Sequence, residues 1–200
     1  MEKINSNNVG NNVGNNVGNT VENNIAKVMN KTEISLSLTR IAYQIIEDNY
    51  PLDNSVALVG IKSGGEFVAR RLQALIKDIT SVDLEMGFID IALYRDDLIN
   101  VVTDPILNGT EIDFNVLGKK IVLLDDVFFT GRTIRAALDA LIDFGRPKIV
   151  KLAVVVDRNC GEYPIRPDYY GKQIIIPRNK KVKMIFKEKD GEDLVFIKDK

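Results

Sequence analysis

Two adjacent carboxylates, Asp125 and Asp126, stand between a run of aliphatic residues and a short polar turn at 130–133. The aliphatic run is typical of a buried parallel strand, and ligands of open α/β sheets bind beyond the carboxyl ends of such strands. The turn, Thr-Gly-Arg-Thr, offers two hydroxyls, a glycine and free backbone N–H groups at the start of a helix, which suit a phosphate. We therefore expect a ligand that carries both cis-hydroxyls and a phosphate, as ribose 5-phosphate does. The alternative is a strand that ends in a solvated acid pair before a helix cap.

A second anion-binding turn is predicted at residues 62–65, Lys-Ser-Gly-Gly, which follow an aliphatic segment over 55–61. The backbone amides of a glycine turn with a lysine beside them suit a pyrophosphate, although an ordinary tight turn has the same composition. Arg95 stands at the head of a long polar segment, where an arginine on a closing lid would neutralise a leaving pyrophosphate. Arg158 follows the last central aliphatic segment and would reach the same cleft, with a nucleobase carbonyl as its expected partner. For both arginines, a solvated surface charge is the alternative.

The elements that would position these residues alternate between strand and helix. Such alternation predicts an α/β fold with a central, mostly parallel sheet and helices on both of its faces. The expected helices cover about 32–48, 66–77 and 132–144, and the expected strands cover 55–61, 82–94, 121–124, 149–157, 174–176, 183–186 and 194–197.

Three segments lie outside this core pattern. Residues 160–200 contain short strand-like pieces and are expected to form a small β-rich hood over the strand ends. Residues 95–117 have no periodicity and are expected to form a lid that is mobile without ligand. Residues 1–31 are predicted to be a disordered leader, because Asn-Asn-Val-Gly occurs three times over 7–19 and buries too little surface to fold. One phosphoribosyl-binding domain would then cover 32–200.

Composition excludes several classes of function. The chain of 200 residues has no histidine, so Ser-His-Asp catalysis, Cys-His catalysis and a histidine-bound zinc site are all excluded. Its single cysteine excludes an internal disulfide and suits a reducing cytoplasm, where we expect the protein to act. It has no run of 18 apolar residues, so we expect no membrane span and no membrane partner. A net charge of −1 provides no global attraction to nucleic acid.

Residues 121–133 resemble the signature of the type I phosphoribosyltransferases, enzymes that use phosphoribosyl pyrophosphate (PRPP). The resemblance implies that Asp125 and Asp126 hold the ribose hydroxyls, directly or through Mg²⁺ that is bound mainly by PRPP. It also implies that these two acids and Arg95 are the catalytic residues. The implied contacts to the phosphates of PRPP come from Lys62, Ser63, Gly64, Gly65, Val127, Phe128, Phe129, Thr130, Gly131, Arg132 and Thr133.

The chain over about 32–200 is also similar to a narrower family, the PyrR proteins, which join uracil phosphoribosyltransferase activity to RNA-binding attenuation of pyrimidine operons. The segments most particular to this family are Leu-Tyr-Arg-Asp-Asp-Leu at 93–98 and Pro-Ile-Arg at 164–166. This similarity implies that Arg158 and Val182 contact the base.

The chain departs from the PyrR pattern at positions that bear on both functions. Its pyrophosphate turn lacks the arginine that the family has there, and Phe129 replaces a tyrosine. Tyr43 and Asp48 replace a histidine and an arginine, and Cys-Gly at 160–161 replaces a His-Arg pair. These replacements remove positive charge from the surface that the family uses on RNA.

The resemblance as a whole implies an enzyme that converts PRPP and uracil to UMP and pyrophosphate, with Mg²⁺ as its cofactor. It also implies a homodimer or higher homo-oligomer that binds the mRNA leader of pyrimidine operons in response to UMP. Two alternatives stay open: an RNA-binding attenuator with vestigial catalysis, and a phosphoribosyltransferase for another base, purine or orotate. The residues alone identify neither the base, a general base, the oligomer, nor the role of the leader segment.

Overall fold

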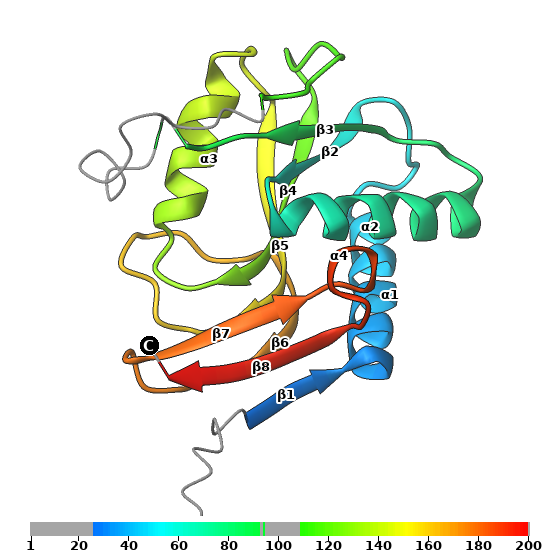
Figure 1. Ribbon diagram of the computed structural model, residues 1–200. Coiled ribbons are helices and arrows are strands. Elements are labelled where there is room, and N and C mark those ends of the chain that lie inside the picture. The colour runs from blue at the N-terminus through cyan, green and yellow to red at the C-terminus, as the bar shows by residue number, and fades with distance from the viewer. Residues whose placement is uncertain (1–25, 93, 95–108, 200) are drawn as a thin grey trace, which may run out of the picture.

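The computed structural model describes residues 26–92, 94 and 109–199 (Figure 1). Its core is a five-stranded parallel sheet with the strand order β3-β2-β4-β5-β6. These strands are β2 (Val56–Ile61), β3 (Glu85–Ile89), β4 (Lys120–Phe128), β5 (Ile149–Asp157) and β6 (Tyr169–Gln173). All of β2 and most of β4 and β5 are buried, which explains their nearly unbroken aliphatic composition. The predicted α/β class is confirmed.

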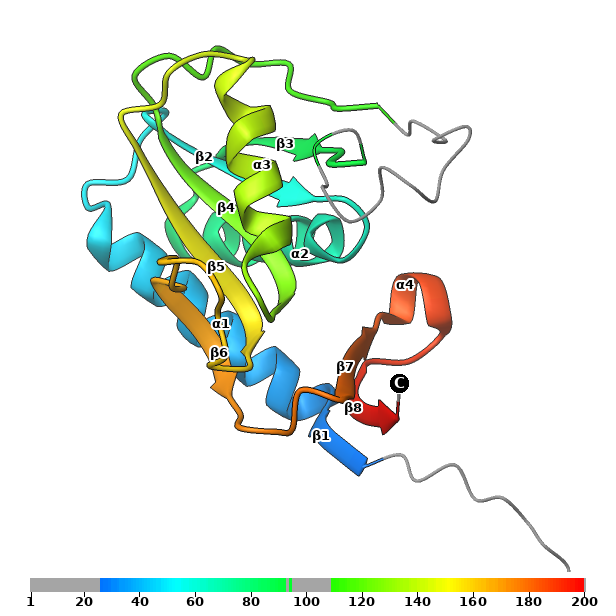
Figure 2. The same cartoon turned by 90° about the vertical axis from the view of Figure 1, so that its left-hand side faces the viewer.

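Helices cover both faces of the sheet (Figure 2). α1 (Lys31–Asp48) and α2 (Gly64–Thr80) pack on one face, and α3 (Arg132–Ile142) packs on the other. The hydrophobic core has two parts, one between the sheet and α1 and α2 (the α1–α2 cluster) and one between the sheet and α3 (the α3 cluster). Side chains of β2 alternate between them: Leu58 packs in the α1–α2 cluster, whereas Ala57 and Val59 pack in the α3 cluster. None of the helices in the described part of the chain is long and apolar enough to cross a membrane.

A separate antiparallel sheet forms the hood, with the strand order β1-β8-β7. It consists of β1 (Ala26–Asn30), β7 (Lys180–Ile185) and β8 (Leu194–Asp199), and α4 (Lys187–Asp190) connects β7 to β8. The hood is fastened to α2, since Arg71 binds both Glu188 and Asp193 at 2.6 Å and Phe67 stacks on Phe186. The hood therefore has a fixed place beside the parallel sheet.

β1 corrects the predicted boundary of the leader. Residues 26–30 pair with β8 and bury Met29, and α1 already begins at Lys31, so the predicted leader over 1–31 extends too far. The N-cap is Asn30, which forms a capping box with Glu33. A five-residue edge strand is too short to be recognised beside an Asn-rich tract. The remainder of the leader, 1–25, lies outside the described residues.

Other predicted boundaries shift for identifiable reasons. α2 begins at Gly64 rather than at 66, and β3 covers only 85–89 of the predicted 82–94. The strand predicted at 174–176 is instead β6 at 169–173, which belongs to the parallel sheet, so the hood begins later than residue 160. β6 is an edge strand with only Tyr169 fully buried, and its exposed polar residues hide the strand pattern.

The segment predicted as a lid divides into two parts. Residues 95–108, including Arg95, lie outside the described residues. Residues 109–117 are packed: Glu111 and Phe88 exchange two backbone hydrogen bonds at 2.7 and 2.8 Å, and Val116 is fully buried. Residues 109–117 are thus packed beside β3, and the mobility of the lid without ligand stays a prediction.

Candidate active site at the carboxyl edge of the sheet

Asp125 and Asp126 lie within β4, three and two residues before its end at Phe128, rather than after the strand as predicted. Asp125 is buried, and its Oδ1 accepts the backbone N–H of Asp126 at 2.9 Å. Oδ1 of Asp126 accepts the N–H of Val127 at 2.8 Å. The side chain of Asp126 turns toward α2, since its Cγ is only 2.5 Å from where a Cβ of Gly64 would stand. Burial raises the pKa of Asp126, although hydrogen bonds with the backbone of Val127, the side chain of Asp125 and its own backbone oppose the rise.

The turn at 62–65 lies directly against this acid pair. The peptide bond between Lys62 and Ser63 is cis, and α2 starts at the next residue. A Cβ at Gly65 would stand 2.0 Å from the carbonyl oxygen of Leu124, so the helix approaches β4 as closely as a backbone can. The cleft at this junction, about 360 Å³, is lined by Lys62, Ser63, Gly64, Asp90, Ile91, Ala92, Asp125, Asp126, Val127 and Thr133. The predicted pyrophosphate turn and acid pair therefore share one cleft.

Lys62 is held by the segment that follows the undescribed part of the predicted lid. Its Nζ donates to Oε1 of Glu111 at 2.6 Å and to the carbonyl oxygen of Gly109 at 2.7 Å. Its side chain is 13% exposed, whereas that of Glu111 is 57% exposed. Sequence reasoning missed Glu111 and Asp90, because both reach the cleft through tertiary contacts that no motif marks.

The predicted phosphate turn also forms an open cradle. Gly131 is the N-cap of α3 with φ of +92°, a conformation that favours glycine, and its carbonyl accepts the N–H of Arg135 at 2.9 Å. The cradle, about 310 Å³, is lined by Asp125, Val127, Phe128, Phe129, Thr130, Gly131, Arg132, Thr133 and Ile134. Asp125, Val127 and Thr133 line both this cradle and the pyrophosphate cleft. The two predicted anion sites are thus contiguous, and Asp125 lines both of them.

Arg158 is buried and contacts Phe129, the residue that precedes the phosphate turn. Its guanidinium lies 3.9 Å from the ring centroid of Phe129, and its Nη2 donates to the carbonyl oxygen of Pro177 at 3.3 Å. Its buried Nε has no hydrogen-bond partner within the described part of the chain, and burial lowers the pKa of the guanidinium. Val182, the other predicted base contact, pairs with Ile197 in the hood and packs on the α1–α2 cluster. Neither Val182 nor Arg158 is among the residues that line the pyrophosphate cleft, the phosphate cradle or the cavity at the ends of β4, β5 and β6, so the contact of both residues with a base stays a prediction.

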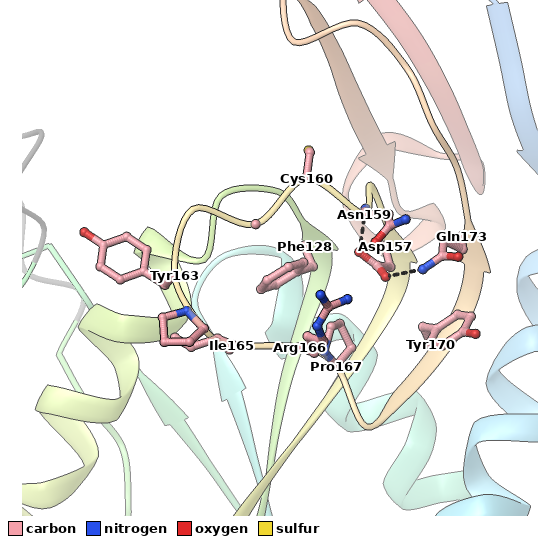
Figure 3. Close-up of a pocket in the computed structure, with 12 residues that line it drawn as sticks. Phe128, Asp157, Asn159, Cys160, Tyr163, Ile165, Arg166, Pro167, Tyr170 and Gln173 are labelled. Carbon is pink, nitrogen blue, oxygen red and sulfur yellow. Dashed lines mark hydrogen bonds between the residues drawn. The ribbon is translucent and has the colours of Figure 1, made fainter.

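A third cavity of about 290 Å³ opens where β4, β5 and β6 end (Figure 3). The buried carboxylate of Asp157 accepts the N–H of Asn159 at 2.7 Å and Nε2 of Gln173 at 2.9 Å. Phe128 and Tyr170 stand on its walls, and the segment from Cys160 to Pro167 closes its outer side.

The acids fit a magnesium ion only in part. Within residues 26–92, 94 and 109–199, no group of three acidic, cysteine or histidine side chains converges as a metal site. Asp125 and Asp126 are hard oxygen donors of the kind that Mg²⁺ prefers, but a complete octahedral shell would need oxygens from the ligand and water. This arrangement suits a metal that arrives on a phosphorylated substrate.

Comparisons with known proteins agree with this geometry. Residues 26–186 match the phosphoribosyl transferase domain family. The chain is 48% identical over 174 residues to the protein named bifunctional protein PyrR of Acetivibrio thermocellus, covering 87% of this chain and 94% of the relative. It is also 48% identical over 174 residues to the protein of that name from Clostridioides difficile, covering 87% of this chain and 98% of the relative.

Solved structures share the fold at low sequence identity. The hypoxanthine phosphoribosyltransferase of Trypanosoma cruzi has a TM-score of 0.64 at 18% identity, covering 88% of this chain and 97% of that chain. A hypoxanthine-guanine phosphoribosyltransferase of Bacillus anthracis has a TM-score of 0.57 at 18% identity, covering 76% and 84%. With two anion cradles around an acid pair, and near-half identity to relatives of one name over most of its length, the chain belongs to the phosphoribosyltransferase family and, within it, to the PyrR proteins.

Proposed function

We propose that this protein transfers ribose 5-phosphate from PRPP to N1 of uracil, giving UMP and pyrophosphate. The observation that carries the proposal is the place of Asp125 and Asp126 between two contiguous anion cradles. PRPP has the same order of groups: a 5-phosphate, a ribose with two cis-hydroxyls, and a pyrophosphate. One strand, β4, holds the hydroxyl-binding acids at a fixed distance from both turns.

The bond from the anomeric carbon to pyrophosphate breaks as positive charge builds on the ribose. Asp125 and Asp126 would orient the ribose through its hydroxyls, and their negative charge favours that transition state; one such preorganised group contributes about 3–4 kcal/mol. Lys62 would leave Glu111 and pair with the pyrophosphate that departs. The amides at the N-terminus of α3 and the hydroxyls of Thr130 and Thr133 would hold the 5-phosphate. These contacts fix the two ends of the substrate while its centre reacts.

Magnesium would be shared between Asp125, Asp126 and the oxygens of PRPP, where it would neutralise the leaving pyrophosphate. A magnesium ion would also balance the charge of the cleft. Three carboxylates, Asp90, Asp125 and Asp126, line it, and Lys62 is its one lining cation among the described residues.

Arg158 supports recognition of a base with carbonyl oxygens. Its buried Nε has no hydrogen-bond partner among residues 26–92, 94 and 109–199, and an unpaired buried donor favours a ligand that completes the hydrogen bond. Stacking on Phe129 sets the plane of the guanidinium beside the phosphate turn. We assign no general base and expect removal of the N1 proton to rely on water or the backbone.

A second function, binding of a pyrimidine-operon RNA leader, is favoured by membership of the PyrR group and opposed by local charge. Several basic residues are paired with acids of the same chain: Lys151 with Asp48, Lys172 with Glu33, Arg178 with Glu162 and Lys180 with Asp199. Among the described residues, no acid pairs with Arg146, Arg166, Lys181 or Lys183, and these four would carry the remaining phosphate contacts. Each lost phosphate contact lowers the salt-dependence slope of RNA binding by about one unit.

Two assays test these functions separately. Purified protein should convert PRPP and Mg²⁺ to a labelled mononucleotide with uracil, at least ten times faster than with orotate, hypoxanthine or guanine. Activity only with a purine or orotate would refute the choice of uracil. Filter binding of the leader transcript of its own pyrimidine genes, with and without UMP, tests the regulatory function, and sedimentation of the free protein tests the expected homo-oligomer.

A further inference from the structure

Glu162 joins the phosphate turn to the segment that connects β6 with the hood. Its backbone N–H donates to the carbonyl oxygen of Thr130 at 2.8 Å. Its carboxylate binds two arginines with different oxygens: Oε2 lies 3.3 Å from Nη2 of Arg132, and Oε1 lies 3.1 Å from Nη1 of Arg178. Arg132 begins α3 and Arg178 precedes β7, so one side chain connects two distant parts of the chain.

The segment that Glu162 reaches also contacts the arginine assigned to the base. Pro177, next to Arg178, accepts a hydrogen bond from Arg158 at 3.3 Å. Arg158 in turn stacks on Phe129 of the phosphate turn, and its backbone N–H donates to the carbonyl oxygen of Phe128 at 3.0 Å. A continuous chain of contacts therefore runs from the phosphate turn through Glu162 to the neighbour of the base-binding arginine.

We infer that Glu162 is a positioning residue that couples the phosphate turn to the base site. This inference rests on the proposed function, since it concerns the affinity for a nucleotide that fills both sites. Glu162 is 33% exposed, and its single charge lies between two guanidinium groups that would otherwise repel each other. Without this charge, Arg178, which is 64% exposed, would be released to solvent, and the segment with Pro177 would lose its link to the phosphate turn.

The inference predicts that a ligand filling both sites depends on Glu162 more than a ligand filling one. Partly exposed ion pairs shift an equilibrium by about 1.4- to 5-fold each. Glu162→Gln keeps the side chain's shape and the backbone bond to Thr130 but removes the charge. We expect it to weaken UMP about threefold to tenfold, while ribose 5-phosphate, which occupies only the phosphate side, changes less than about twofold.

The experiment is calorimetric titration of the full chain with UMP and with ribose 5-phosphate at equal Mg²⁺. Glu188→Gln is the matched control, because Glu188 also pairs with an arginine, Arg71, but lies on the hood away from both cradles. This control should leave both affinities unchanged. In the enzyme assay, Glu162→Gln should raise the KM for uracil by the same factor as the UMP dissociation constant, with kcat within about twofold.

Arg178→Ala gives a second, independent measurement. It should weaken UMP to a similar degree, and combining it with Glu162→Gln should add little, because both changes break the same link. Wild-type UMP affinity in Glu162→Gln, or an equal loss for both ligands with a lowered melting temperature, would overturn the inference alone. A wild-type protein that binds neither ligand would overturn the proposed function first.

Discussion

The first turn of α2 packs so closely on β4 that one added methyl group should disable the site. In Gly65→Ala, the new Cβ would stand 2.0 Å from the carbonyl oxygen of Leu124 and 3.1 Å from Cα of Asp125. Both obstacles are backbone atoms of a buried strand, so no flexible side chain can yield. The start of the helix would have to retreat by about 1 Å to reach even the 3.0 Å below which such contacts are not seen.

That retreat has two measurable consequences. Overpacking of this kind costs about 1–3 kcal/mol, which lowers the melting temperature of a domain of this size by roughly 2–12 °C. A misplacement of about 1 Å between reacting groups costs about 100-fold in rate. We therefore expect kcat/KM for PRPP to fall about 100-fold, measured at a temperature where the variant is folded. Thermal unfolding and initial rates of labelled UMP formation measure the two effects separately.

Gly118→Ala is the control, because it should lower the stability of the protein without moving the residues of the site. Gly118 has φ of +75° and open space around its Cβ position, and it precedes β4 at the opposite end from the acids. The strained backbone should cost about 1 kcal/mol and leave kcat/KM unchanged. Wild-type turnover in Gly65→Ala would refute the argument that this close contact sets the turn against Asp125.

Four further expectations follow from the site. Asp126→Asn should lower kcat/KM about 100- to 1,000-fold, and a fall of less than about threefold would contradict its role on the ribose. Because burial raises the pKa of Asp126, the free protein should lose stability as the pH rises from about 4 through that raised pKa, and urea unfolding of Asp126→Asn should show this loss removed. Glu111→Ala should lower the KM for PRPP about 1.5- to 5-fold by releasing Lys62, and an increased KM would contradict this competition. Arg158→Met should raise the KM for uracil about 10- to 100-fold with the KM for PRPP unchanged, and equal changes in both would contradict a base contact.

The sequence predicts the sheet well where burial dictates composition. β5 begins at Ile149 and ends at Asp157 as expected, because its last six residues are buried and Lys151 is the one charged residue before Asp157, which leaves an almost wholly apolar composition. β1 and β6 were missed because they are edge strands, in which Met29 and Tyr169 are the fully buried residues. With one fully buried residue among five, neither strand shows the alternation of apolar and polar residues by which a strand is recognised in a sequence.

The site follows the same rule, since its contiguous parts were predictable and its distant parts were not. The acid pair and both turns are short segments whose residue types suit a phosphate, and the structure brings them into adjoining clefts. Glu111 and Glu162 carry no such local signal. Glu111 reaches Lys62 only through its bridge to Phe88, and Glu162 reaches the phosphate turn only because β4 and β5 are neighbours.

The position of the acids within β4, rather than after it, changes what the pair can do. Successive residues of a strand point to opposite faces of the sheet. Asp126 turns toward α2 and lines only the cleft of the pyrophosphate turn, whereas Asp125 lines both that cleft and the phosphate cradle. In a loop, two neighbouring carboxylates could both point at the same ligand group. In β4, Asp125 and Asp126 are adjacent in sequence but point to different sides of the strand. A ribose lying across the end of β4 can therefore be held from both sides, with each acid facing a different substituent.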